Sequence, residues 1–460
     1  MALRFTLLSV VALSTFACAP AAPLPEGPRV TASAVSSAPA PAPALTGLHF
    51  DIAAVDAHAD ACTDFYDYAC GGWRATHPIP GDQARWSRYS ELVAVNAEHE
   101  RTLVEDAAKS GAAASPAEQR VGAYYAACMD EAGIDARGLA PIHDLLASID
   151  AIKTKADAQA VLADLHVHAI EALFATYAET DPEDSTKMVV RLDKGSLGLP
   201  DPGDYTNKDD ASVARRASYL AHLNRLFRLV GANEAAAKKS AERVLAFETS
   251  LAAHALSAAD RRNHDLQNHP MKLAELKRKY PAIDWPTYFA KLGVPATDHV
   301  NVAQPAWLAA VHEALTRKDL AALRDYLRMI SVRAAAMVLP RAIEEEVFDF
   351  RQKTLRGIRE MAPRWKRCLR AVDGDIGDDV GRIFLARYFT DETRTRAHTM
   401  VDALVAAYRA RLASSDWLGG PARDAALAKL DKSLIVLGAS NRPRSFDGLR
   451  IDRADPYGVW

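Results

Sequence analysis

Apolar residues recur at three- and four-residue spacing through most of this 460-residue chain, and this pattern limits the possible folds more than any other feature. Residues 213–231 illustrate it, with apolar side chains at Tyr219, Leu223, Leu226, Phe227 and Val230. Gly231 then supplies a stop signal. The pattern continues at 318–360 and 393–432. Because apolar residues at this period line one face of an α-helix, the sequence predicts long amphipathic helices from about residue 92 onward.

Strand patterns are few by comparison. Residues 188–192 and 433–436 are short apolar runs of the kind found in β-strands. Clusters of Gly and Pro at 195–205 and 263–271 predict loops. The sequence therefore predicts a mainly α fold with minor β structure.

The N-terminal segment has the pattern of an export signal. Arg4 gives a basic start, and residues 5–16 form an apolar run that is short for a membrane span. The small residue before Cys18 resembles a bacterial lipoprotein box, in which this cysteine is lipidated after residues 1–17 are removed; a plain cleaved signal is the alternative. Residues 18–47 contain seven prolines and predict an extended tether. We therefore expect an exported protein, periplasmic or held at the outer membrane only by a lipid on Cys18.

Composition and charge exclude one class of partner. The chain is 49% hydrophobic and 25% charged, which is ordinary for a globular protein. The formal net charge is −3, so no electrostatic signal favours nucleic acid.

The most specific motif lies at residues 62–80, which read Cys-Thr-Asp-Phe-Tyr-Asp-Tyr-Ala-Cys-Gly-Gly-Trp-Arg-Ala-Thr-His-Pro-Ile-Pro. Further motifs are Tyr-Tyr-Ala-Ala-Cys at 124–128, Gly-Leu-Pro-Asp-Pro-Gly-Asp-Tyr at 198–205 and Pro-Arg-Trp-Lys-Arg-Cys at 363–368. In order and spacing these motifs resemble the neprilysin and endothelin-converting-enzyme family of zinc metallopeptidases. The resemblance covers roughly residues 50–455.

The resemblance implies a fold and an activity. In the family, a large multi-helical N-terminal lobe and a zinc-bearing lobe enclose a central cavity that admits only peptides. Residues 48–445 would form the helical lobe, with minor β structure. The implied activity is that of a zinc metalloendopeptidase, which cleaves oligopeptides by attack of zinc-activated water.

The zinc motif of such enzymes is missing from these residues. His-Glu-x-x-His on a helix places two imidazoles one turn apart, and its Glu acts as general base. Of the two His-Glu pairs here, one begins at His99 and reaches Leu103, and the other begins at His312 and reaches Thr316. We therefore predict no catalytic residue and no metal ligand in this chain, so that zinc is implied for the family only. We expect no hydrolysis unless a separately encoded catalytic domain takes part.

Four cysteines remain once Cys18 is set aside, and counting alone allows three pairings. The resemblance implies a disulfide between Cys128 and Cys368. Cys62 and Cys70 match cysteines whose partners lie in the zinc-bearing lobe of the family. In this chain we expect those two to be free, bridged to each other under strain, or paired with another chain.

The resemblance also implies one substrate contact. In the family an arginine shortly after the Ile-Pro binds the C-terminal carboxylate of the peptide, and Arg85 matches it by spacing. A guanidinium suits this role because its fork gives a carboxylate two parallel hydrogen bonds. The alternative is a surface arginine on the first helix. Ser90 and Val93 stand where the family has charged residues, so the rest of that subsite is not matched.

The last residues of the chain, 446–460, resemble the link into the zinc-bearing lobe. We interpret the chain as truncated within this link. Two other interpretations remain: a non-catalytic periplasmic module that binds peptides, and a degenerate fragment whose exposed apolar face favours aggregation.

Overall fold

The structure is a computed structural model that describes residues 51–110, 114–317, 320–438 and 442–452. The chain divides into two compact units, residues 1–76 and 77–460. The predicted signal peptide, the tether and Cys18 lie outside the described residues, as do residues 453–460 of the predicted link. The boundaries proposed for these segments therefore stay predictions.

The described part of the first unit contains a short turn and one helix in close contact. The turn is η1 (Ile52–Ala54) and the helix is α1 (Phe65–Thr76). A Cβ atom added at Gly72 of α1 would lie only 2.3 Å from the carbonyl oxygen of Ala53. The second glycine of the 62–80 motif is therefore required by the close approach of η1 to α1.

The second unit contains the other described elements, most of which are helices. In chain order they are α2 (Arg88–Ser110), α3 (Pro116–Met129), α4 (Glu131–Arg137), η3 (Ala140–Ile142), α5 (His143–Asp150), α6 (Lys155–Val167), β1 (Phe174–Thr180), β2 (Met188–Lys194), α7 (Gly203–Thr206), α8 (Asp210–Leu229), α9 (Glu234–Ala252), η4 (Asp260–Arg262), η5 (His264–Gln267), β3 (Pro270–Lys272), α10 (Leu273–Lys279), α11 (Trp285–Lys291), β4 (His299–Val302), α12 (Pro305–Thr316), α13 (Ala321–Ala334), η6 (Ala336–Val338), α14 (Arg341–Phe348), the π-helical η7 (Asp349–Thr354), α15 (Arg364–Tyr388), α16 (Asp391–Ala413) and α17 (Gly420–Asp431). The mainly α fold with minor β structure is confirmed.

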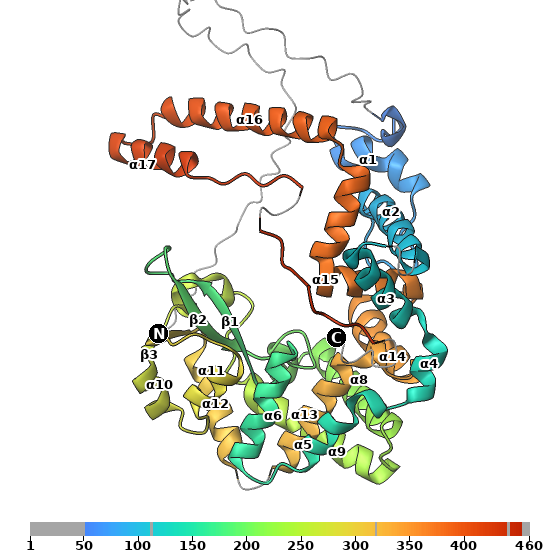
Figure 1. Cartoon of the computed structure of the whole chain (residues 1–460), viewed down its shortest axis with the longest axis vertical. Helices are drawn as coiled ribbons and strands as arrows, with labels where there is room; N and C mark the ends of the chain where they lie inside the picture. Colours follow the sequence, from blue (N-terminus) through green and yellow to red (C-terminus); the bar gives the residue numbers. More distant parts are fainter. Residues whose placement is uncertain (1–50, 111–113, 318–319, 439–441, 453–460) are drawn as a thin grey trace, which may run out of the picture. The chain divides into compact units, whose positions relative to one another are not determined.

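Most of these helices surround one large core, which extends from η3 to η7. In α8 the buried side chains include Tyr219, Leu223, Leu226 and Phe227, as their spacing predicts. The helix ends just before Gly231, whose φ of +97° lies in the left-handed region that glycine tolerates. Helix α8 packs against α9, and α9 packs against α13 (Figure 1).

A four-stranded sheet adjoins this core in the order β1-β2-β4-β3. Strands β1 and β2 are antiparallel, β2 and β4 are parallel, and β3 and β4 are antiparallel. The strand predicted at 188–192 is confirmed as β2. The strand predicted at 433–436 is wrong, because these exposed residues pair with no strand in the described part of the chain. Strands β3 and β4 have only three and four residues, too few to show an alternating pattern.

A second, smaller core joins α2, α3 and α15. Cys128 of α3 and Cys368 of α15 form a disulfide, which confirms the predicted pair. Arg120 of α3 donates from Nε to Oδ2 of Asp379 in α15 at 2.7 Å, and the side chain of Asp379 is fully buried. A covalent bond and a buried ion pair thus both attach α15 to α3.

Helices α16 and α17 form a hairpin that follows α15 (Figure 1). Neither helix has a buried side chain. Met400, Leu404 and Tyr408 of α16 recur every four residues and are 62%, 52% and 64% exposed, and Trp417 in the connection is 80% exposed. After the hairpin, in the segment 442–452, Phe446 packs against the small core. The hairpin therefore presents an apolar stripe that no described residue covers.

Candidate peptide-binding site

The loop that carries Arg85 is attached to the segment that leads into α15. Backbone N–H groups of residues 359 and 360 both donate to the carbonyl oxygen of Gly81 at 3.0 Å. Lys366 of α15 forms an ion pair from Nζ to Oδ2 of Asp82 at 2.9 Å, and the Asp82 side chain is only 9% exposed. Helix α15 also carries the disulfide to α3, so the same helix holds both the loop and the small core.

Arg85 itself is exposed and lies three residues before α2, rather than on a helix. It makes no hydrogen bond or ion pair within the described residues. Its neighbour Arg88 differs, since that guanidinium pairs with Glu91 at 3.3 Å. The hydroxyl of Ser87 accepts a hydrogen bond from the Ser90 N–H at 3.2 Å, which caps the start of α2. Arg85 is therefore a free cation held at a capped helix start.

The first turns of α2 add an apolar surface beside this cation. Tyr89, Leu92 and Val93 are 75%, 57% and 48% exposed, whereas Leu103 and Val104 further along the helix are buried in or beside the small core. A guanidinium next to exposed apolar side chains can bind both the carboxylate and the last side chain of a peptide.

The remaining predicted cysteines lie in the first unit. Cys62 is exposed and Cys70 is half-buried, and both have free thiols. The two thiols therefore do not bridge each other in this structure, and pairing with another chain stays a prediction.

The two His-Glu pairs have packing roles. His99 stacks on Tyr388 of α15 with ring centroids 4.5 Å apart, which joins α2 to α15. His312 of α12 accepts at Nδ1 a hydrogen bond from the Ala282 N–H at 3.2 Å. Among residues 51–110, 114–317, 320–438 and 442–452, no group of three or more His, Cys, Asp or Glu side chains is arranged to hold a metal ion.

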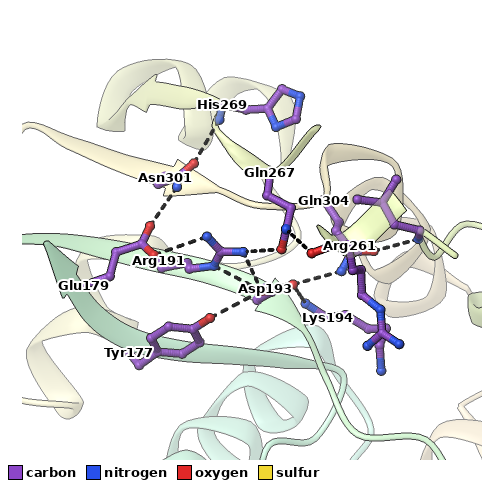
Figure 2. A network of polar contacts seen from close by, with 11 residues as sticks. Tyr177, Glu179, Arg191, Asp193, Lys194, Arg261, Gln267, His269, Asn301 and Gln304 are labelled. Carbon is purple, nitrogen blue, oxygen red and sulfur yellow. Dashed lines mark hydrogen bonds and ion pairs between the residues drawn. The ribbon is translucent and has the colours of Figure 1, made fainter. Parts of the chain in front are cut away.

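A polar network on the sheet is a feature that the sequence pattern does not indicate (Figure 2). Arg191 of β2 contacts Oε2 of Glu179 at 3.2 Å and Oδ2 of Asp193 at 2.9 Å, and it donates to Oε1 of Gln267 at 2.8 Å. Asn301 of β4 donates from Nδ2 to Oε1 of Glu179 at 2.7 Å. Each carboxylate thus has at least two donors.

The side chains of this network bond to one another across the strands and so stabilise the sheet. Burial alone would raise the pKa of the Asp193 carboxyl, but hydrogen bonds from the Lys194 N–H, Gln304 and Arg191 together hold this pKa below its usual value. A carboxylate that stays ionised and fully hydrogen-bonded is a poor general base. No sequence pattern reveals the network, because Arg191 and Asp193 lie in β2 whereas their partner Gln267 comes from the distant 3-10 helix η5.

The fold and these features define a class, the helical N-terminal domain of neprilysin-like zinc metallopeptidases. The chain belongs to peptidase family M13, whose N-terminal domain pattern matches residues 61–439.

Relatives and solved structures agree with this assignment. Endothelin-converting enzyme 1 of Mus musculus is 27% identical over 399 residues, which are 84% of this chain and 51% of the relative. The zinc metalloprotease Zmp1 of Mycobacterium tuberculosis, in complex with an inhibitor, is 32% identical with a TM-score of 0.82, over 89% of this chain and 62% of Zmp1. PepO of Lactobacillus rhamnosis shares the fold, with 19% identity and a TM-score of 0.73 over 81% of this chain and 59% of PepO. The chain spans about half the length of the curated relatives that it matches.

Proposed function

We propose that this chain is the substrate-enclosing helical lobe of an exported zinc metalloendopeptidase that cleaves oligopeptides. Other polypeptide would supply the zinc ligands and the general base, because the 460 residues contain no His-Glu-x-x-His. The match to the N-terminal domain of family M13 over residues 61–439 carries the proposal.

Exposed apolar surface supports a docked zinc-bearing lobe. Such surface occurs on the first turns of α2, on α16 and in residues 434–436, where Leu434 is 78% exposed. In soluble proteins, contiguous exposed apolar patches mark interaction surfaces. We propose that the hairpin of α16 and α17 contacts the zinc-bearing lobe.

Reconstitution tests this proposal. We would measure bound zinc and cleavage of an internally quenched peptide by the chain alone and after mixing with the zinc-bearing domain of an M13 peptidase. We expect no cleavage by either part alone and cleavage by the mixture. Leu404→Glu in the exposed stripe should weaken reconstitution at least tenfold, equivalent to about 1.4 kcal/mol, whereas Arg396→Glu, also exposed on α16, is the matched control. Stoichiometric zinc and cleavage by the chain alone would contradict the proposal.

A second candidate function is peptide binding without cleavage, which the free guanidinium of Arg85 favours. A short peptide and its C-terminally amidated form would be titrated into the full chain by calorimetry. We expect the free acid to bind at least about tenfold more tightly, as for a charge-assisted pair. Arg85→Ala should abolish this preference, and Arg88→Ala should keep it, because Arg88 is already paired with Glu91. Equal affinity for acid and amide would exclude the role of Arg85.

We further propose export, with a lipid on Cys18 as the membrane anchor. The disulfide between Cys128 and Cys368 supports an oxidising compartment. In the described part of the chain, no helix combines the length and hydropathy needed to cross a bilayer. Metabolic labelling with a fatty-acid analogue should label the native protein and not Cys18→Ser. Export without labelling would indicate a plain cleaved signal peptide and no lipid on Cys18.

A further inference from the structure

The Gly-Leu-Pro loop after β2 encloses a buried carboxyl group. Glu248 of α9 is fully buried, and its Oε2 accepts hydrogen bonds from the Gly198 N–H at 3.3 Å and the Tyr205 hydroxyl at 2.7 Å. A Cβ atom at Gly198 would lie 1.9 Å from the hydroxyl oxygen of Tyr219, so only glycine fits. The motif therefore has a structural role around Glu248.

A buried arginine next to this group forms no ion pair with any described residue. Arg333, in the last turn of α13, is 8% exposed, and its Nη1 donates to the Tyr219 hydroxyl at 3.3 Å. Its Nε is buried and has no hydrogen-bond partner among the described residues. Within the described residues Arg333 forms no ion pair. Burial raises the pKa of the nearby Glu248 carboxyl, although the charge of Arg333 acts on this carboxyl in the opposite sense. A buried guanidinium without an anion is costly.

Arg333 lines a cavity of about 160 Å³ together with a second arginine, Arg351. Arg351 comes from the π-helical η7 and makes no hydrogen bond or ion pair with the described residues. Partial burial of the guanidinium, and then the charge of Arg333, lower the pKa of Arg351, although the residue as a whole is exposed. Two guanidinium groups therefore line one cavity, and within the described residues neither forms an ion pair with a carboxylate, an arrangement that an anionic ligand would stabilise.

Another part of the cavity wall is held in a fixed conformation. The wall is formed by residues 169–171, and Ala169 and Leu173 have φ values of +56° and +61°, which are unusual for residues other than glycine. The Leu173 N–H donates to the Tyr326 hydroxyl at 3.0 Å, and Trp307 Nε1 donates to the Leu173 carbonyl at 2.7 Å. These bonds fix the loop, so the cavity is preformed.

We propose that this cavity binds a small carboxylate monoanion between Arg333 and Arg351. The fork of a guanidinium matches the two oxygens of a carboxylate, and 160 Å³ has room for a small organic acid. The exposed carboxylate of Glu171 also lines the cavity and disfavours multiply charged anions. The site contains neither Arg85 nor any proposed zinc-bearing part, so it goes beyond the peptidase proposal.

Calorimetric titration of the full chain with sodium acetate, at constant ionic strength maintained with sodium chloride, tests the site. We expect saturable binding that Arg351→Gln weakens at least about tenfold. Glu171→Gln should tighten binding because it removes a like charge. Arg351 and Glu171 are both exposed, so these variants avoid the folding loss that Arg333→Gln could cause. The control is Arg356→Gln, which removes a neighbouring exposed arginine that donates to Gln352 and does not line the cavity, and which should change the affinity far less than Arg351→Gln.

A tripeptide and its amide, titrated into the Arg85→Ala variant, distinguish the two sources of a carboxylate. Binding of acetate and of the free-acid tripeptide, each lost in Arg351→Gln, would indicate a site that accepts chain ends. Binding of acetate alone would indicate a small organic acid. Absence of saturable acetate binding, or equal affinities of the Arg351→Gln and Arg356→Gln variants, would overturn the proposal, whatever the outcome of reconstitution with zinc.

Discussion

Helices α8 and α16 have similar lengths, 20 and 23 residues, and both carry apolar residues at helical spacing. Their surroundings differ, because α8 buries Tyr219, Leu223, Leu226 and Phe227 in the large core, whereas α16 buries no side chain. Spacing alone therefore predicts that a helix forms, but not whether the same chain provides a surface to cover it. The described chain covers the apolar side of α8 within the large core, but it leaves the apolar stripe of α16 exposed.

We expect the largest loss of stability from removing the disulfide of the small core. Helix α15 of this core leads directly into the hairpin of α16 and α17, so the change tests how firmly the hairpin is attached. Replacing both Cys128 and Cys368 with Ser removes a disulfide that joins residues separated by 240 positions. In the chain-entropy model this should lower the free energy of unfolding by about 5 kcal/mol. Urea unfolding under non-reducing conditions measures the loss. An unchanged midpoint would show that the small core does not depend on the disulfide.

Matched leucine truncations compare the two helices directly. Leu226→Ala in α8 leaves a void in the large core and should cost about 3 kcal/mol of unfolding free energy. Leu404→Ala in α16 removes an exposed side chain and should change it by less than about 0.5 kcal/mol. Both are read from urea unfolding of the isolated chain. Equal losses would mean that α16 is covered after all.

The pH dependence of stability should report on the large core through His166. Burial lowers the pKa of this imidazole to about 4 from an ordinary 6.5, although a hydrogen bond to the Ala172 carbonyl acts in the opposite sense. Between these pH values the unfolded chain binds the proton more readily, so stability falls as the pH decreases from 6.5 to 4, by about 3 kcal/mol. His166→Gln should flatten this slope in unfolding experiments across that range. A slope unaffected by the substitution would exclude His166 as its source.

A smaller effect of opposite sign is expected from His299, at the sheet. Its pKa is raised by hydrogen bonds to Asp298 and then Asp181, so the protonated imidazole is the form that folding favours. The stability that it contributes is complete below pH 6.5 and is lost as the pH rises through the folded pKa. His299→Gln should therefore reduce stability at pH 6 more than at pH 9. A loss that is the same at both pH values would contradict the assignment.

Local features of the fold could be predicted from the sequence. The apolar spacing in α8 and the stop at Gly231 predict that helix, and the apolar run at 188–192 predicts β2. Strand β4 could not be predicted, because four residues carry no period and their pairing with β2 depends on a partner about 110 residues away. At 433–436 an apolar run indicates a strand, but in the described chain no neighbour completes it.

The same division applies to the candidate sites. Arg85 and the pair Cys128 and Cys368 could be found because a family motif gives their spacing. The sequence could not show that Arg85 has no ion-pair partner among the described residues, since this depends on how the side chains around it are arranged. The cavity of Arg333 and Arg351 brings together four separate segments of the chain, and no single segment shows a pattern for it.

The disulfide between Cys128 and Cys368 also makes most of the large core part of a covalent ring that runs from α4 through η7. A protease that cuts one peptide bond in this ring would leave both products attached to each other. The nicked protein would migrate as one species until a reductant separated it. In the exported setting proposed above, the chain would thus keep both pieces after a single cut anywhere along this stretch.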